Sequence, residues 1–224
     1  MKANIIAIDG PAGAGKSTVA RLVARKLGYL YIDTGAMYRA VAWAAQAKGV
    51  SIDDAAALTE LAGSVSIRLA DVDGRQQVSA DGCDITDAIR TPAVSRSVSA
   101  VAAVPGVRAA LLTQQRQMAA AGGVVMDGRD IGTCVLPDAD VKIFLTASID
   151  ERARRRCLEL QRNGFAADQA QLRQEIAHRD QMDCERETAP LRQAEDAVSI
   201  DTSNLTIEQA VAEIVAVHEK RCRP

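Results

Sequence analysis

A lysine and a serine end a glycine-rich segment near the start of the chain, a combination that can bind phosphate. The segment reads Gly10-Pro11-Ala12-Gly13-Ala14-Gly15-Lys16-Ser17, with Thr18 next, and matches the P-loop pattern G-x-x-x-x-G-K-[ST]. In this pattern backbone N–H groups surround phosphate oxygens, the lysine reaches the terminal phosphates, and the serine hydroxyl joins the shell of Mg²⁺. A glycine-rich turn with an incidental Lys-Ser pair is the alternative. We expect residues 10–18 to bind ATP and Ser17 to be a metal ligand.

An aspartate at the end of a later apolar run is a second candidate for the metal site. Asp127 follows Val124-Val125-Met126, and P-loop enzymes hold magnesium with an acidic residue at a strand tip. The alternative is an ordinary strand-ending aspartate. We expect Asp127 to assist Mg²⁺, whereas Asp130 suits either the metal or the acceptor.

Arginines crowd into two stretches further along the chain. Helical spacings of three and four place Arg152 on one face with Arg155 and Arg156. Such a face can close over ATP as a lid and stabilise charge on the transferring group; the alternative is a solvated basic face paired with neighbouring glutamates. We expect a lid at about residues 150–190, with Arg155 contacting the donor.

The elements that must position these residues alternate between strand and helix. Apolar runs predict strands at residues 5–8, 29–32, 124–126, 141–145 and 198–200, and helical periodicity predicts helices at residues 17–27 and 36–48. A turn is expected at Asp33-Thr34-Gly35. Two more helices are expected after Pro92, separated at Pro105-Gly106 and stopped at Gly122-Gly123.

Residues of about 64–87 interrupt this alternation. Val65, Ile67 and Leu69 alternate with polar residues, and Asp73-Gly74 predicts a hairpin turn. Capping boxes mark two later helix starts, at Ser148 with Glu151 and at Thr206 with Gln209. We therefore predict one α/β domain over residues 1–224, of three layers, with a central parallel sheet, a small antiparallel insert and a short lid.

Composition narrows the possible partners. A net charge of -2 argues against broad binding to nucleic acid, whose polyanion requires a basic face. The apolar run at residues 5–8 is too short for a signal peptide or membrane span. The five cysteines are scattered and form no C-x-x-C pair, as expected for reduced thiols. We expect a cytoplasmic protein that binds small molecules.

The P-loop predicts the phosphoryl donor but leaves the acceptor open. GTPases and motors usually carry further guanine-reading or coupling elements, and this chain has no N-K-x-D sequence. A small kinase is therefore favoured. Such an enzyme brings a second substrate in line with the donor and uses arginines to neutralise the transferring group.

Several strings elsewhere in the chain resemble bacterial cytidylate kinases, in order and nearly end to end. They are Gly13-Ala14-Gly15-Lys16-Ser17-Thr18, Asp33-Thr34-Gly35-Ala36-Met37-Tyr38-Arg39, Ile89-Arg90-Thr91, Val107-Arg108, Asp127-Gly128-Arg129-Asp130-Ile131-Gly132-Thr133, Arg179-Asp180-x-x-Asp183-x-x-Arg186 and Pro190-Leu191. The resemblance implies transfer of the γ-phosphoryl group of ATP to CMP or dCMP with Mg²⁺, by a monomer. The segment Asp180-Gln181-Met182-Asp183-Cys184-Glu185-Arg186 is less basic than in many relatives, so altered donor affinity or lid closure is expected.

The resemblance also implies which residues contact the substrates. The expected acceptor-binding set is Thr34, Tyr38, Arg39, Ser99, Arg108, Arg129, Asp130, Asp183 and Arg186, and the expected catalytic set is Lys16, Arg129, Asp130, Arg179 and Arg186. Arg39 and Arg129 suit bidentate contact to the acceptor phosphate, and Asp183 suits the sugar hydroxyls. The acceptor region and insert are expected at about residues 36–105.

Two rivals remain. One is another small-molecule kinase acting on UMP, AMP or shikimate, against which the D-G-R-D string at residues 127–130 argues. The other is a regulatory module that binds ATP without turnover. A pure switch would not need the arginine strings of an acceptor site.

Overall fold

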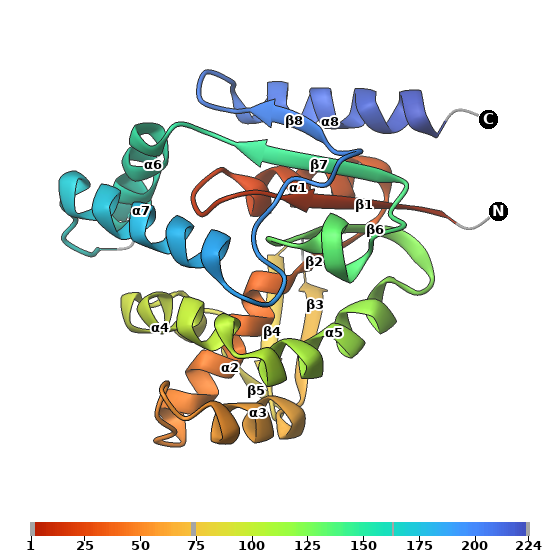
Figure 1. Cartoon of the computed structure of the whole chain (residues 1–224). Coiled ribbons are helices and arrows are strands. Elements are labelled where there is room, and N and C mark those ends of the chain that lie inside the picture. The colour runs from red at the N-terminus through yellow and green to blue at the C-terminus, as the bar shows by residue number, and fades with distance from the viewer. Residues whose placement is uncertain (1–2, 73–74, 163, 223–224) are drawn as a thin grey trace. The chain divides into compact units, whose positions relative to one another are not determined.

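The computed structural model of the chain describes residues 3–72, 75–162 and 164–222 (Figure 1). Its described residues form two compact units. We call Met1–Tyr31 with Ala121–Pro224 the sheet unit, and Ile32–Ala120 the helical unit.

The sheet unit is built on a five-stranded parallel sheet with the strand order β2-β6-β1-β7-β8. The strands are β1 (Ala3–Asp9), β2 (Leu30–Asp33), β6 (Gly122–Asp127), β7 (Val141–Thr146) and β8 (Val198–Asp201). Central strand β1 is fully buried from Ile6 to Ile8, as its continuous apolar run predicts. The apolar faces of α1 (Lys16–Leu27) and α8 (Ile207–Arg221) pack with these strands in one core. The predicted central parallel sheet is confirmed.

The register of the strands brings their carboxyl ends to one edge. Ile8 lies opposite Asp127 in β6, and Asp9 lies opposite Phe144 in β7. Ligands of open parallel sheets bind at this edge. Beyond it lie η2 (Ile131–Val135), a π-helical turn, and the helices α6 (Ile149–Arg162) and α7 (Gln169–Glu185), which pack against each other.

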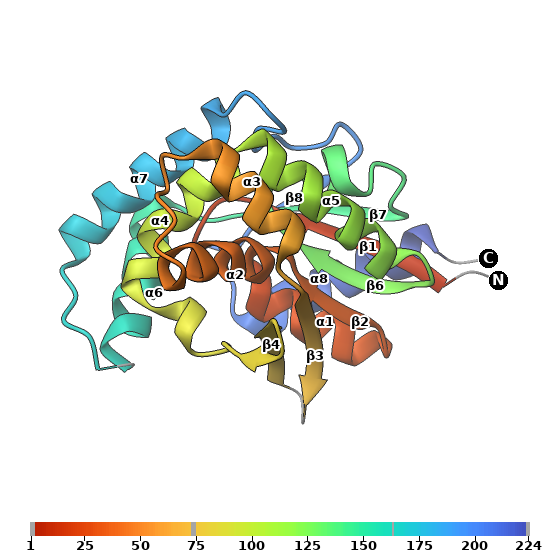
Figure 2. The ribbon, with the colours of Figure 1, turned by 90° about the horizontal axis from the view of Figure 1, so that it is seen from below.

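The helical unit has its own core. It contains α2 (Thr34–Ala47), α3 (Ala55–Ser64), η1 (Ala88–Arg90), α4 (Pro92–Ala103) and α5 (Pro105–Ala119), with an antiparallel sheet of β3 (Ile67–Val72), β4 (Arg75–Ala80) and β5 (Cys83–Asp84). Figure 2 shows α3 beside α5 and β3 beside β4. The predicted antiparallel insert is therefore confirmed, and its predicted turn at Asp73-Gly74 lies outside the described residues.

Two local expectations were wrong, and one helix was not predicted at all. The turn expected at Asp33-Thr34-Gly35 is the start of α2, because the Asp33 carboxylate accepts a hydrogen bond from the Ala36 N–H at 2.9 Å and caps the helix. Helix α3 was not expected, although Asp54 caps it in the same way through the Ala57 N–H. Gly122 and Gly123 begin β6, whereas α5 already ends at Ala119.

The two predicted capping boxes have different outcomes. At Thr206 the reciprocal pair with Gln209 is complete. At Ser148 the hydroxyl accepts from the Glu151 N–H at 3.3 Å, but the Glu151 carboxylate binds Arg154 and Arg155. None of the helices in the described ranges has the length and apolarity needed to cross a membrane.

Candidate functional site

The P-loop follows β1 and turns through three glycines in the left-handed region of backbone space. Their φ angles are 146° at Gly10, 78° at Gly13 and 89° at Gly15. A Cβ on Gly10 would lie 1.9 Å from the carbonyl oxygen of Leu145, so the turn admits only glycine there. Gly15 caps α1, whose first turn contains Lys16, Ser17 and Thr18. The N–H groups of this turn and the helix dipole can bind an anion.

Lys16 is buried inside this loop. Its Nζ donates a hydrogen bond to the carbonyl oxygen of Pro11 at 2.7 Å. Burial lowers the pKa of Lys16 to about 7; the positive charges of Arg129 and Arg179 add to this shift, while the charges of Asp127 and Asp183 oppose it. A polyphosphate beside Lys16 would stabilise its charged form.

Ser17 and Asp127, the two residues expected at the metal, are in contact with each other. The Ser17 hydroxyl donates to Asp127 Oδ2 at 3.1 Å, and the Tyr31 hydroxyl donates to Asp127 Oδ1 at 2.8 Å. Hydroxyl and carboxylate oxygens are ligands that Mg²⁺ prefers, so this pair fits the metal. The described residues hold no cluster of three or more His, Cys, Asp or Glu side chains suited to a metal. Tyr31 was not among the expected site residues, although it lies in the predicted strand at residues 29–32.

Four charged residues from two distant parts of the chain form a largely buried cluster, which we call the charge cluster: Arg129, Asp130, Asp183 and Arg186. Arg129 Nε donates to Asp183 Oδ2 at 2.8 Å, and Arg186 Nη2 donates to Asp130 Oδ1 at 3.3 Å. Arg186 Nη1 also lies 3.9 Å from Asp183 Oδ1. Burial alone would raise the pKa of Asp183, but Arg129, Arg179 and Arg186 outweigh it and hold the pKa below its ordinary value.

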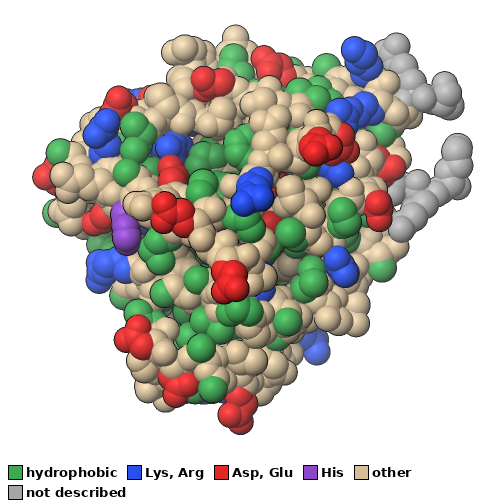
Figure 3. Space-filling model, viewed as in Figure 1, with side chains coloured by type: hydrophobic (Ala, Val, Ile, Leu, Met, Phe, Trp, Pro, Cys, Tyr) green, Lys and Arg blue, Asp and Glu red, His purple; other side chains and the backbone are tan. Residues whose placement is uncertain are grey.

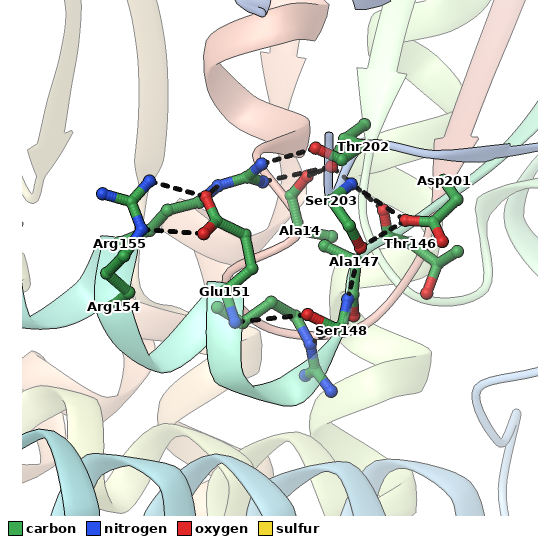
Figure 4. Close-up of polar contacts among 11 residues, drawn as sticks. Ala14, Thr146, Ala147, Ser148, Glu151, Arg154, Arg155, Asp201, Thr202 and Ser203 are labelled. Carbon is green, nitrogen blue, oxygen red and sulfur yellow. Dashed lines mark hydrogen bonds and ion pairs between the residues drawn. The ribbon is translucent and has the colours of Figure 1, made fainter. Parts of the chain in front are cut away.

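Arg155 in α6 lies beside the P-loop (Figure 4). Its Nη1 donates to Thr202 Oγ1 at 3.1 Å, its Nη2 donates to the Thr202 carbonyl oxygen at 2.7 Å, and its Nε donates to Glu151 at 2.8 Å. The buried Thr202 hydroxyl is within hydrogen-bond distance of the carbonyl oxygens of Ala14 and Thr146. Thr202 thus links α6, the P-loop and β7. No motif pointed to Thr202, since its role depends on contacts far away in sequence.

The other two arginines of the expected lid face have different partners. Arg152 is buried and bonds to the carbonyl oxygens of Ala12 and Ala147 and to Asp180 in α7. Arg156 pairs with Glu159 along the surface of α6. The solvated-face alternative is therefore wrong for Arg152, because its guanidinium joins α6 to the P-loop and to α7.

The remaining expected acceptor residues belong to the helical unit. Arg39 in α2 donates to Ser95 Oγ at 2.8 Å and to the carbonyl oxygen of Ile89 at 3.3 Å. The Arg108 guanidinium in α5 lies 5.5 Å from the centre of the Tyr38 ring, a cation–π contact. Thr34 at the start of α2 and Ser99 in α4 are also buried. Sequence reasoning missed Ser95, which orients Arg39.

Comparisons with known proteins agree with these features. A model of the cytidylate kinase family matches residues 6–220. The chain is 56% identical over 216 residues to a cytidylate kinase of Geobacillus thermodenitrificans, covering 96% of each chain. It is 58% identical over 212 residues to one of Pelotomaculum thermopropionicum, covering 94% of each. Among solved structures, an uncharacterized protein from Eubacterium ventriosum superimposes with a TM-score of 0.52 at 15% identity, covering 98% of this chain and 100% of that one; this likeness concerns the fold alone.

Proposed function

Because this chain belongs to the cytidylate kinase family, we propose that it transfers the γ-phosphoryl group of ATP to CMP or dCMP, giving CDP or dCDP and ADP. The main structural support comes from the charged residues around Lys16. Arg129, Arg179 and Asp183 lie close enough to the P-loop lysine, Lys16, to shift its pKa. Two residues assigned to the acceptor, Arg129 and Asp183, and the catalytic candidate Arg179 are therefore near the residue assigned to the donor phosphates, which supports the proposal.

On the donor side, residues 10–18 bind the phosphates of ATP through backbone N–H groups, and Lys16 binds the terminal phosphates. Arg155 contacts the donor from α6, held in place by Glu151 and Thr202. Ser17 and Asp127 would hold Mg²⁺, which neutralises part of the charge on the β- and γ-phosphates when bound.

On the acceptor side, Arg129 and Arg39 bind the α-phosphate of the monophosphate through bidentate contacts. Asp183 binds the sugar hydroxyls, with Arg186 and Asp130 beside it in the charge cluster. Arg108 and Ser99 read the edge of cytosine, while Tyr38 and Thr34 line the site. If Arg108→Ala left the discrimination between CMP and UMP unchanged, the base-reading role would be wrong.

The reaction is an in-line displacement at the γ-phosphorus. An α-phosphate oxygen of CMP forms the new P–O bond, and the bond to the β,γ-bridging oxygen breaks, so that ADP leaves with that electron pair. The attacking oxygen is already anionic, so no strong base is needed. Lys16, Arg129, Arg179 and Arg186 compensate the charge that spreads over the transferring group.

The proposal also covers the domain organisation, the oligomeric state, the location and the partners of the protein. We propose that the chain acts as one catalytic domain and as a monomer in the cytoplasm, with a lid at about residues 150–190 and without nucleic-acid partners. Acidic and basic side chains are interspersed over the face shown in Figure 3, which supports small-molecule substrates over a polyanion.

The deciding experiment measures ADP production by the purified protein with MgATP and each of CMP, dCMP, UMP, AMP and dTMP. We expect turnover that depends on CMP or dCMP and is lost in Lys16→Ala. If ATP bound but no monophosphate stimulated turnover, the kinase proposal would fall and a nucleotide-binding switch would replace it.

A further inference from the structure

We propose that Asp9 is a positioning residue, which fixes the backbone that carries Arg129 and Asp130 against the end of the P-loop strand. This inference rests on the proposed function, because it assigns Asp9 a part in acceptor binding. Asp9 is the last residue of β1 and immediately precedes Gly10 of the P-loop. Its side chain holds the backbone of residues 128–132 in place by hydrogen bonds.

The Asp9 carboxylate uses both of its oxygens on this segment. Oδ1 accepts a hydrogen bond from the Ile131 N–H at 2.8 Å, and Oδ2 accepts one from the Gly132 N–H at 2.7 Å. These N–H groups open the helical turn η2, where the first donors have no partner within the turn. The Gly128 N–H donates to the carbonyl oxygen of Ile8 at 3.0 Å. The segment is thus attached to the end of β1 on both sides of Arg129 and Asp130.

The two side chains between these attachments belong to the charge cluster. Arg129 binds Asp183, and Asp130 binds Arg186. A shift of the segment by a fraction of an ångström would move both side chains together. Catalysis by positioning is sensitive to such shifts, because misplacement by about 1 Å can reduce rate about a hundredfold.

The two N–H donors at this position match the two oxygens of an aspartate side chain. Asp9 is only 5% exposed, and a buried carboxylate is unfavourable unless hydrogen bonds compensate for the lost water. The N–H groups of Ile131 and Gly132 both point at the Asp9 side chain, and each needs an acceptor oxygen there. Asparagine has one acceptor oxygen and one NH₂ donor, so one of the two N–H groups would face another donor.

The test compares Asp9→Asn with Asp140→Asn. Asp140 is a matched control because its Oδ2 also accepts from a backbone N–H of β1, that of Ile5, at 2.7 Å, but at an exposed place. KM for CMP, KM for ATP and kcat are measured for each, together with hydrogen exchange of the Ile131 and Gly132 amides by NMR.

For Asp9→Asn we expect lost protection of both amides, a fall in kcat/KM for CMP of about tenfold or more, and a change in KM for ATP of less than about threefold. Asp140→Asn should change none of the three kinetic constants. Unchanged kcat/KM for CMP, or an equal loss for ATP and CMP, would overturn the positioning role.

A second variant keeps the test decisive if Asp9→Asn does not fold. A Cβ on Gly132 would lie 3.1 Å from Lys142 Cδ, a tight contact, and 3.4 Å from Asp9 Oδ2, so Gly132→Ala pushes the start of η2 away from the Lys142 side chain while keeping the Asp9 carboxylate. It should show the same selective loss for CMP, and normal kinetics in this variant would contradict the inference. Failure of the proposed function is distinguishable, because the unsubstituted chain would then show no turnover with CMP at all.

Discussion

Arg152 in α6 donates a hydrogen bond from Nη1 to the carbonyl oxygen of Ala12 in the P-loop at 3.1 Å. The same nitrogen donates to Asp180 Oδ2 at 2.6 Å. One buried guanidinium therefore joins the phosphate-binding loop to both helices of the expected lid. The conformation of the P-loop is coupled to the packing of α6 against α7 through this residue.

Replacing Arg152 by Met should weaken both stability and ATP binding. The Asp180 carboxylate would lose its buried partner, and breaking such a pair costs about 3 kcal/mol or more of unfolding free energy. Urea denaturation and KM for ATP test this. The matched control is Arg173→Met, which breaks an exposed ion pair between the same helices and should cost less than about 1 kcal/mol. Equal effects of the two variants would contradict the coupling.

Thr202→Val should raise KM for ATP, because it removes the hydroxyl that links Arg155 to the P-loop and β7 (Figure 4). The carbonyl oxygens of Ala14 and Thr146 would lose a donor, for which we expect a loss of about 1–3 kcal/mol of unfolding free energy. Thr202→Ser keeps the hydroxyl and should restore KM for ATP. A serine variant as impaired as the valine variant would show that the methyl group matters instead.

Gly13→Ala should impair ATP binding for two separable reasons. Gly13 has a φ of 78° and Gly164 one of 80°, so alanine at either position is strained by about 1–2 kcal/mol. The Cβ added at Gly13 would lie 3.1 Å from Arg152 Cβ, whereas at Gly164 it would meet no other described part of the chain within 4 Å. Denaturation should show the larger loss for Gly13→Ala, and only this variant should raise KM for ATP.

Asp183→Asn should reduce turnover with CMP more than it affects ATP. The substitution removes the negative charge that Arg129 and Arg186 share, and the expected fall in kcat/KM for CMP is about tenfold or more. Steady-state kinetics with each substrate varied provide the measurement. Asp196→Asn breaks the more exposed pair with Lys142 and is the control. A change confined to KM for ATP would argue against an acceptor role.

The contribution of Asp9 to stability should depend on pH. Burial raises its pKa from 3.8 to about 6; the Asp130 charge adds to the rise, while two backbone N–H donors and Lys16 oppose it. Between these values the folded chain binds more protons than the unfolded chain, so this contribution is present below the unfolded pKa and lost as pH rises through the folded pKa.

We therefore expect the difference in unfolding free energy between the unsubstituted chain and Asp9→Asn to decrease by roughly 2 kcal/mol from pH 4 to pH 7. Urea denaturation of both proteins at unit pH intervals measures the difference. A difference that stays constant over this range would show that Asp9 has an ordinary pKa in the folded chain.

Local sequence patterns predicted those features whose physical cause lies within a few neighbouring residues. The P-loop is one contiguous segment, and the continuous apolar runs of β1 and β7 predict buried parallel strands without reference to the rest of the chain. The start of α2 was misplaced for a related reason. Asp33, Thr34 and Gly35 favour a turn by composition, yet an aspartate that satisfies the Ala36 N–H begins a helix equally well. Packing of α2 in the helical core selects between the two.

The sequence by itself therefore determined the donor loop, the α/β architecture and, by family resemblance, the expected acceptor residues. Only the tertiary structure decided what these residues contact. Arg129 and Asp183 are 54 residues apart, and Arg155 and Thr202 are 47 apart, so their pairing depends on strand register and helix packing. For the same reason, the role of Asp9 at the end of β1 does not follow from the sequence alone. Its two partners lie more than a hundred residues away, and the parallel pairing of β1 with β6 brings them to it.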